Sequence, residues 1–229
     1  MTAYEWDYTK PCFITEEEVE RAKSLIGVKL RRKPHNRVAS RRAVVDFVRA
    51  IGDRNPLFLS EDYGMGTFWG TMLAHPLWLY TVDDTIIAPC LRGVPTIYAG
   101  ARWEFERPVK LWDEVDAEAR LIDVVEKEGR FCGKMILQVG EIVYKNRRGE
   151  IVARAISKVM RTPREEAKRR GKYMRIKKHK YTREELYRIE DYYDGEEIRG
   201  GEPRYLEDVE VGEELVPVVK GPLTSEDML

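Results

Sequence analysis

The chain has few of the residues that bind metal ions or form disulfides, and those few do not cluster. It holds three cysteines and three histidines among 229 residues. They lie far apart, with no CxxC spacing: Cys12, Cys90, Cys132, His35, His75 and His179. Because a structural zinc site needs four such ligands at close spacing, the sequence predicts no metal site, and a reducing compartment is the default.

The sequence also lacks an excess of charge and any long hydrophobic run. Forty Lys and Arg balance forty Asp and Glu, so no overall field attracts nucleic acid or an anionic membrane. No run approaches the ~20 apolar residues that span a bilayer, and residues 1–13 lack the features of a signal peptide. With 43% hydrophobic residues the chain has enough apolar content for a core. We therefore expect a cytoplasmic globular protein that binds neither nucleic acid nor membranes.

Two short amphipathic helices are predicted near the start of the chain. Thr15 and Glu18 form a capping box that opens a helix over residues 16–26. Ser40 caps a second helix, which ends at Gly52. Its buried face is predicted from apolar residues at helical spacing, namely Val44, Phe47, Val48 and Ile51.

Beyond a loop-rich stretch over residues 64–96, the period of the apolar residues changes from 3.6 to 2. Alternation predicts strands near residues 97–105 and 115–121, and turn signals separate two longer strands at about 130–145 and 150–161. We expect a four-stranded antiparallel meander behind a buried helix.

The last third differs in kind. A basic run over residues 164–188 is read either as a solvated linker or as a site for RNA or nucleotide phosphates, and composition favours the linker. Thr182 opens a short helix through a second capping box, and an apolar stripe suggests that this helix docks. Residues 223–228 echo residues 14–19, as if a second copy of the domain were about to begin.

The turn after the second predicted helix reads Gly-Asp-Arg-Asn-Pro-Leu-Phe over residues 52–58. This turn and its surroundings resemble the MaoC-like acyl dehydratases and hydratases, specifically the amino-terminal half of their double-hotdog members. The matching stretches follow in order along nearly the whole chain: FITEEEVERAKSLIG, HNRVASRRAVVDFVRAIGDRNPLF, AGARWEFERPVKLWDEV, VVEKEGRFCGKM, GEIVYKNRRGEIVARA and RGGEPRYLEDVEVGEELVPVVKGPLT. The resemblance implies an α+β hotdog, an antiparallel sheet wrapped around a central helix, with a charged C-terminal extension.

The resemblance also divides the chain. Residues 1–162 are expected to form the hotdog domain, and 163–204 a charged linker with a short helix. Residues 205–229 are expected to be an extended segment resembling the start of a second, missing hotdog.

In active members of this family an aspartate, with a histidine five positions later, carries the proton transfers. Asp53 matches the aspartate, but Phe58 stands at the histidine position and cannot exchange a proton. Asp53 and Asn55 are the catalytic candidates that the resemblance leaves, with a turn stabilised by their own side chains as the simpler interpretation. Both interpretations remain open.

The resemblance further implies an acyl-binding cavity. Its candidate contacts are Phe58, Tyr63, His75 and Trp78. His75 is also considered as a substitute base, although a single histidine in an apolar stretch is more often structural. Packing is the first explanation for Trp78 and acyl contact the second.

The expected function is that of a substrate-shaping subunit or half of an enoyl-CoA hydratase or 3-hydroxyacyl-CoA dehydratase, with the catalytic Asp and His supplied by a partner hotdog. The expected ligand is acyl-CoA, without a cofactor. The expected protein partner is a second MaoC-like hotdog subunit, another copy of the chain in a homodimer, or both. Two alternatives are a non-catalytic acyl-CoA-binding module and the remnant of a split or frameshifted longer hydratase.

Overall fold

The computed structural model describes residues 14–30, 32–129, 133–163 and 179–222. The chain divides into two compact units, which we describe separately. The first, the sheet unit, comprises Met1–Arg37, Leu79–Arg107 and Val115–Ile176, and the second, the turn unit, comprises Val38–Trp78, Pro108–Glu114 and Lys177–Leu229. Cys12, Cys132, most of the basic run and the segment from Leu223 lie outside the described residues.

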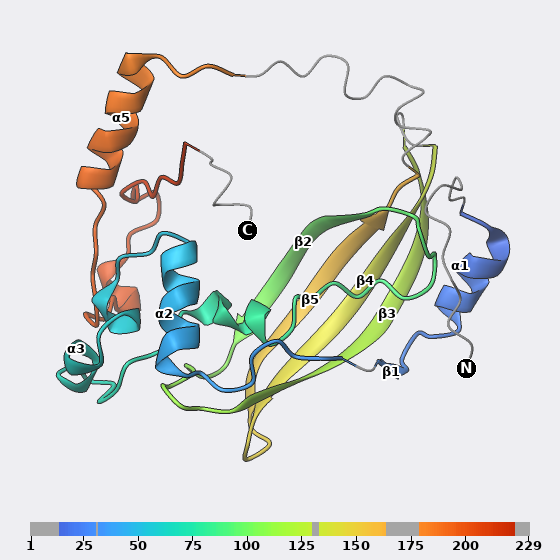
Figure 1. Cartoon of the computed structure of the whole chain (residues 1–229), viewed down its shortest axis with the longest axis horizontal. Helices are drawn as coiled ribbons and strands as arrows, with labels where there is room; N and C mark the ends of the chain where they lie inside the picture. The colour runs from blue at the N-terminus through green and yellow to red at the C-terminus, as the bar shows by residue number, and fades with distance from the viewer. Residues whose placement is uncertain (1–13, 31, 130–132, 164–178, 223–229) are drawn as a thin grey trace. The chain divides into compact units, whose positions relative to one another are not determined.

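The sheet unit is built on a five-stranded antiparallel sheet (Figure 1). In chain order the strands are β1 (Lys29–Leu30), β2 (Thr96–Phe105), β3 (Val115–Gly129), β4 (Gly133–Asn146) and β5 (Ile151–Arg161). The spatial order is β1-β3-β4-β5-β2. The predicted four-stranded meander is therefore wrong in its first pairing, because β2 pairs with β5 and not with β3. Only β3, β4 and β5 form a meander.

Two bulges change which residues of a strand face the same side. The register of β2 against β5 shifts between Tyr98 and Gly100, and that of β3 against β4 shifts between Leu121 and Asp123. A bulge adds one residue, so the alternation of faces is broken there. Most of β2 is exposed on both sides of its bulge, including Ile97 at 42% and Phe105 at 47%.

An extended segment, residues 82–95, runs along one face of the sheet (Figure 1). Ile87 lies directly over Gly140, where an added Cβ would come within 2.3 Å of its side chain. The side chain of Gln138 donates to the carbonyl of Pro89, and the guanidinium of Arg161 donates to those of Ala88 and Leu91. The segment is thus fixed by both packing and hydrogen bonds.

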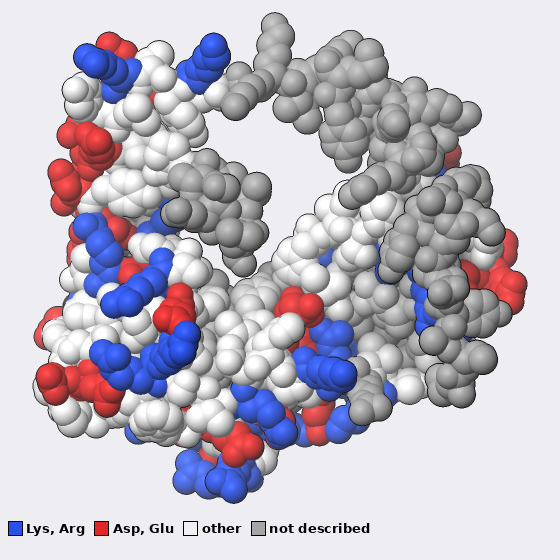
Figure 2. Space-filling model, viewed as in Figure 1, with Lys and Arg blue, Asp and Glu red and all other residues white. Residues whose placement is uncertain are grey.

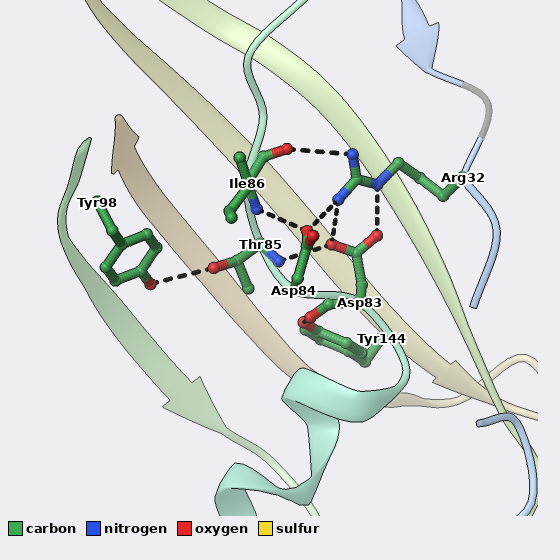
Figure 3. A network of polar contacts seen from close by, with 7 residues as sticks. All are labelled: Arg32, Asp83, Asp84, Thr85, Ile86, Tyr98 and Tyr144. Carbon is green, nitrogen blue, oxygen red and sulfur yellow. Dashed lines mark hydrogen bonds and ion pairs between the residues drawn. The ribbon is translucent and has the colours of Figure 1, made fainter. Parts of the chain in front are cut away.

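A buried polar network anchors the start of this segment (Figure 3). Arg32 binds the Asp83 carboxylate through two donors at 2.6 and 2.7 Å, and the Asp83 side chain is 2% exposed. Asp83 Oδ1 also accepts the backbone N–H of Thr85 at 2.8 Å, and the Tyr144 hydroxyl donates to the Asp83 carbonyl at 3.0 Å. Thr85 has a φ of 60°, rare for a β-branched residue, and the network holds it there.

Helix α1 (Glu16–Lys23) begins as predicted and ends earlier. Thr15 Oγ1 accepts the N–H of Glu18, which is half of the predicted capping box. Glu18 instead directs its carboxylate to the N–H of Leu91, at 2.8 Å, so it ties the helix to the segment over the sheet.

The turn unit contains α2 (Arg41–Ala50), the short 3-10 helix η1 (Pro56–Phe58), α3 (Glu61–Met65), α5 (Arg183–Asp194) and η3 (Leu206–Asp208). A further 3-10 helix, η2 (Pro76–Thr81), spans the boundary between the units. Ser40 caps α2 and Thr182 forms a full capping box on α5, both as predicted. On α2, Val44 and Val48 are buried as expected, whereas Phe47 is half-buried.

The described residues 179–222 group with residues 38–78 in the turn unit. The predicted division at residues 162 and 204 stays a prediction. On the face in Figure 2, basic and acidic side chains alternate over the described surface. Within the described ranges no helix is long and apolar enough to cross a bilayer.

Candidate functional site

The turn that follows α2 is the first part of the candidate site. Gly52 has a φ of 65°, which suits the glycine that ends a helix. Asp53 Oδ1 accepts the N–H of Asn55 at 2.8 Å, and Asn55 Oδ1 accepts the N–H of Leu57 at 2.9 Å. Both side chains therefore shape the turn, and Asp53 Oδ2 is the oxygen left to face other groups.

His75 lies opposite this oxygen. Its Nε2 is 3.7 Å from Asp53 Oδ2, and its Nδ1 accepts the N–H of Leu77 at 3.1 Å. The neutral imidazole therefore carries its proton on Nε2, toward the carboxylate. Burial lowers the pKa of His75 from its ordinary value, while the negative charge of Asp53 opposes that shift. The site thus pairs a carboxylate that can accept a proton with an imidazole N–H that can donate a hydrogen bond.

Two aromatic rings flank the imidazole. The ring of Phe58 meets His75 edge-on with centroids 5.3 Å apart, and Phe47 lies 5.9 Å away. Phe58 thus occupies the position at which the resemblance expects histidine, and a histidine from elsewhere in the chain comes beside Asp53. A carboxylate, an imidazole and two apolar rings form one cluster.

The pairing of His75 with Asp53 depends on contacts distant in sequence. The N–H of Leu73 donates to the carbonyl of Leu57, which sets this segment beside η1. The N–H of Ala74 donates to the carbonyl of Val109 on its other side. No local sequence pattern predicts that His75 lies beside Asp53, because the two residues are brought together by these backbone hydrogen bonds.

The other predicted site residues lie in two different environments. Tyr63, on α3, is 37% exposed, and its hydroxyl accepts the N–H of Gly201 at 3.1 Å. Trp78 is fully buried, and its indole N–H has no partner among the described residues. The roles of Phe58, Tyr63, His75 and Trp78 as acyl contacts stay predictions.

A groove of about 850 Å³ lies beside Tyr63. It is formed by α3, the following loop and the segment 200–205, and it is rich in aromatic side chains: Tyr63, Phe68, Trp69 and Tyr205. Asp62 and Glu202 also line it, and none of its described lining residues is basic. This groove therefore suits an apolar group better than a phosphate. Among the described residues no group of three or more His, Cys, Asp or Glu is placed to hold a metal ion.

Comparison with known proteins agrees with the resemblance. Residues 24–155 match the family model described as the FAS1-like dehydratase domain region. A 3-hydroxybutyryl-CoA dehydratase of Methylorubrum extorquens is 29% identical over 100 residues, which are 44% of this chain. The match spans only 64% of the length of that relative.

Solved structures with a similar fold include two complexes from Mycobacterium tuberculosis. A chain of the C-terminally truncated HadBC (3R-hydroxyacyl-ACP dehydratase) complex is 21% identical, with a TM-score of 0.48, covering 59% of this chain and 96% of its own. A chain of the ChsH1–ChsH2 complex is 19% identical, with a TM-score of 0.49, covering 65% and 90%.

The family match spans more than half of the chain and includes α2, the Asp53 turn, His75 and the first four strands of the sheet. The α+β fold is thereby confirmed in a hotdog-like form with five antiparallel strands. The chain belongs to the family of FAS1-like, MaoC-like dehydratase domains.

Proposed function

We propose that this chain is the substrate-shaping subunit or half of an enoyl-CoA hydratase or 3-hydroxyacyl-CoA dehydratase, and that a partner hotdog supplies the catalytic Asp and His. The observation that carries the proposal is that Phe58 stands at the position of the family's catalytic histidine. Addition of water to an enoyl thioester needs one group to activate the water and another to handle the α-proton. A phenyl ring at the histidine position performs neither task, but it can contact an acyl chain.

The edge of the sheet supports a protein partner. Among the described strands β2 pairs only with β5, so its other edge presents free backbone donors and acceptors over ten residues. Ile97 and Tyr98, 42% and 40% exposed, add apolar surface to this edge. An exposed edge of this length is a template for pairing with another strand. The occupant that we assign to it is the sheet of a second, catalytic MaoC-like hotdog.

The test is reconstitution. The purified chain and a MaoC-like hotdog that retains its Asp and His are assayed for hydration of a 2-enoyl-CoA, separately and mixed. We expect a stoichiometric complex and a rate in the mixture well above the sum of the separate rates. Full activity of the chain alone, or no gain on mixing with a MaoC-like hotdog that retains its Asp and His, would contradict the proposal.

The docking surface has its own matched pair of variants. Ile97→Lys places a charge on the β2 edge, whereas Ile122→Lys places the same charge on β3, which has a strand on either side. We expect the first variant to abolish the complex by size-exclusion chromatography and the second to retain it. If both variants formed the complex equally well, or both failed to form it, the β2 edge would not be the docking site.

One observation favours a second candidate, in which the chain itself performs proton transfer through Asp53 and His75. The 3.7 Å approach of His75 Nε2 to Asp53 Oδ2 gives the turn an imidazole after all. On this candidate the purified chain is active, and Asp53→Asn and His75→Asn each lower kcat by about 10²-fold or more. If both variants complement the partner as well as the unmodified chain does, the second candidate fails and the first stands.

A further inference from the structure

Residues after 182 form hydrogen bonds with the residues on both sides of Asp53. Lys220 Nζ donates to the carbonyl of Gly52 at 2.7 Å, directly before Asp53. Arg54 Nη2, directly after it, donates to the carbonyl of Tyr193 at 2.6 Å. All these residues belong to the turn unit. The residues that flank Asp53 are therefore held by a segment more than a hundred positions away.

Glu196 connects the two holds. Its carboxylate lies 3.1 Å from Arg54 and 3.8 Å from Lys220, and its side chain is only 11% exposed. A carboxylate withdrawn from water to this degree needs cationic partners, and here both partners also bind the turn or its neighbours. One acidic group therefore binds both cations. We refer to Arg54, Glu196 and Lys220 together as the lock.

The lock is closed on its far side by Tyr193. The N–H of Gly221 donates to the Tyr193 hydroxyl at 2.9 Å, and that hydroxyl lies 3.0 Å from the Gly221 carbonyl. The end of α5 is thereby joined to the residues beside Lys220. A third contact reaches the turn itself, since the Asn55 amide donates to the Gly200 carbonyl at 3.4 Å.

The segment covers little apolar surface to explain this grip. No residue of α5 is buried, and residues 205–218 are almost all exposed, including Val211 and Leu206. The hydrogen bonds from its described residues to residues 38–78 converge on residues 52–55 and on Tyr63. Polar contacts concentrated on one short turn indicate a role in fixing that turn, and a general packing role would instead bury apolar side chains.

We infer that Glu196, through Arg54 and Lys220, is a positioning residue that fixes the direction in which Asp53 presents its carboxylate to His75. The extension beyond α5 is then part of the site, although neither Glu196 nor Lys220 contacts His75. The inference itself concerns the geometry of the turn. Only its consequence for catalysis rests on the proposed function, under which the lock prearranges the surface that binds the acyl thioester.

The direct test measures how strongly Asp53 acts on His75. The pKa of His75 is followed by NMR titration of the full chain in four forms: unmodified, Asp53→Asn, Glu196→Gln and both together. In the unmodified chain Asp53→Asn lowers the pKa, because the charge that favours the protonated ring is lost. With Glu196→Gln already present, we expect that lowering to shrink to less than half, because the carboxylate is no longer aimed at the ring. An unchanged lowering would overturn the inference.

Two controls separate positioning from general loosening. Glu214→Gln removes an exposed carboxylate of the same extension and should leave the effect of Asp53→Asn intact. Lys220→Met, at a half-exposed side chain, tests the lock without removing the semi-buried carboxylate, and Lys220→Arg should restore the unmodified result. If Lys220→Met and Lys220→Arg behave alike, Lys220 is not part of the lock.

The catalytic readout uses the two-subunit mixture. Under the proposed function Glu196→Gln raises the KM for the enoyl-CoA several-fold and changes kcat little, since the proton transfers take place on the partner. If the NMR result holds and the KM does not move, the positioning inference stands and the proposed function loses support. If the KM rises without a change in the NMR cycle, the positioning inference fails.

Discussion

Asp53 and Asp83 build the same local turn in the two units of the molecule, yet their surroundings differ. Each accepts, through Oδ1 at 2.8 Å, the N–H of the residue two positions later. Asp83 is 2% exposed and bound by Arg32 through two donors, whereas Asp53 is 27% exposed and faces His75 at 3.7 Å. The shared turn is local chemistry. What faces the second oxygen decides whether the carboxylate stabilises the fold or remains available at a site.

The largest expected difference between the two is in stability. Asp83→Asn keeps an oxygen for the turn but removes the buried carboxylate that Arg32 binds through two donors, leaving Arg32 with the 52% exposed Asp84 as its charged partner. We expect the free energy of unfolding to fall by about 3 kcal/mol, at the low end for a broken buried pair, because Arg32 keeps this exposed partner. Urea denaturation measures this change.

Asp53→Asn is the matched control for that measurement. It preserves the turn in the same way, breaks no close ion pair, and should change the free energy of unfolding by less than about 1 kcal/mol. Equal losses for the two variants would show that Asp53 is as deeply engaged in the fold as Asp83.

A smaller effect is expected at Tyr144, which supports Asp83 through its backbone. Tyr144→Phe removes the hydroxyl that donates to the Asp83 carbonyl at 3.0 Å and leaves that buried oxygen without this donor. The expected loss is about 1–2 kcal/mol, again by urea denaturation. Tyr187→Phe, at a residue 61% exposed on α5, should change stability by less than about 0.5 kcal/mol. If Tyr144→Phe lowered the free energy of unfolding no more than Tyr187→Phe does, the network would not contribute to stability.

The elements of this fold could be predicted from sequence where local interactions decide them. The caps at Ser40 and Thr182 were identified because a side chain and an amide three residues later are enough to form them. Three of the four predicted strands lie within a few residues of β2, β4 and β5, whereas β3 continues to Gly129, well beyond the predicted end near residue 121. The Asx turn at Asp53 was also predicted, as the simpler of two interpretations.

The features that could not be predicted from the sequence depend on contacts between residues far apart along the chain. Which strand β2 joins is settled by pairing with β5, and nothing within β2 encodes that choice. The bulge between Tyr98 and Gly100 interrupts the alternation of faces along β2. In the site, His75 reaches Asp53 only because backbone bonds from Leu73 and Ala74 place its segment there, and Lys220 reaches Gly52 across 168 positions.

The smallest expected effect is a pH dependence that belongs to the Asp53 site alone. Because burial lowers the pKa of His75 below its ordinary value of 6.5, the unfolded chain binds this proton more readily than the folded chain. The contribution of His75 to stability is therefore complete above pH 6.5, declines as the pH falls through that value, and levels off below the lowered pKa of the folded state. His75→Asn removes the titrating group and can still accept the Leu77 N–H. We expect the unmodified chain to lose stability relative to His75→Asn across this window, as measured by urea denaturation at a series of pH values. In the Asp53→Asn background the loss should be larger, since the opposing charge is gone. A loss of equal size in the two backgrounds would mean that the charge of Asp53 does not act on the His75 ring. Asp53 and Asp83 would then differ only in how deeply they are buried.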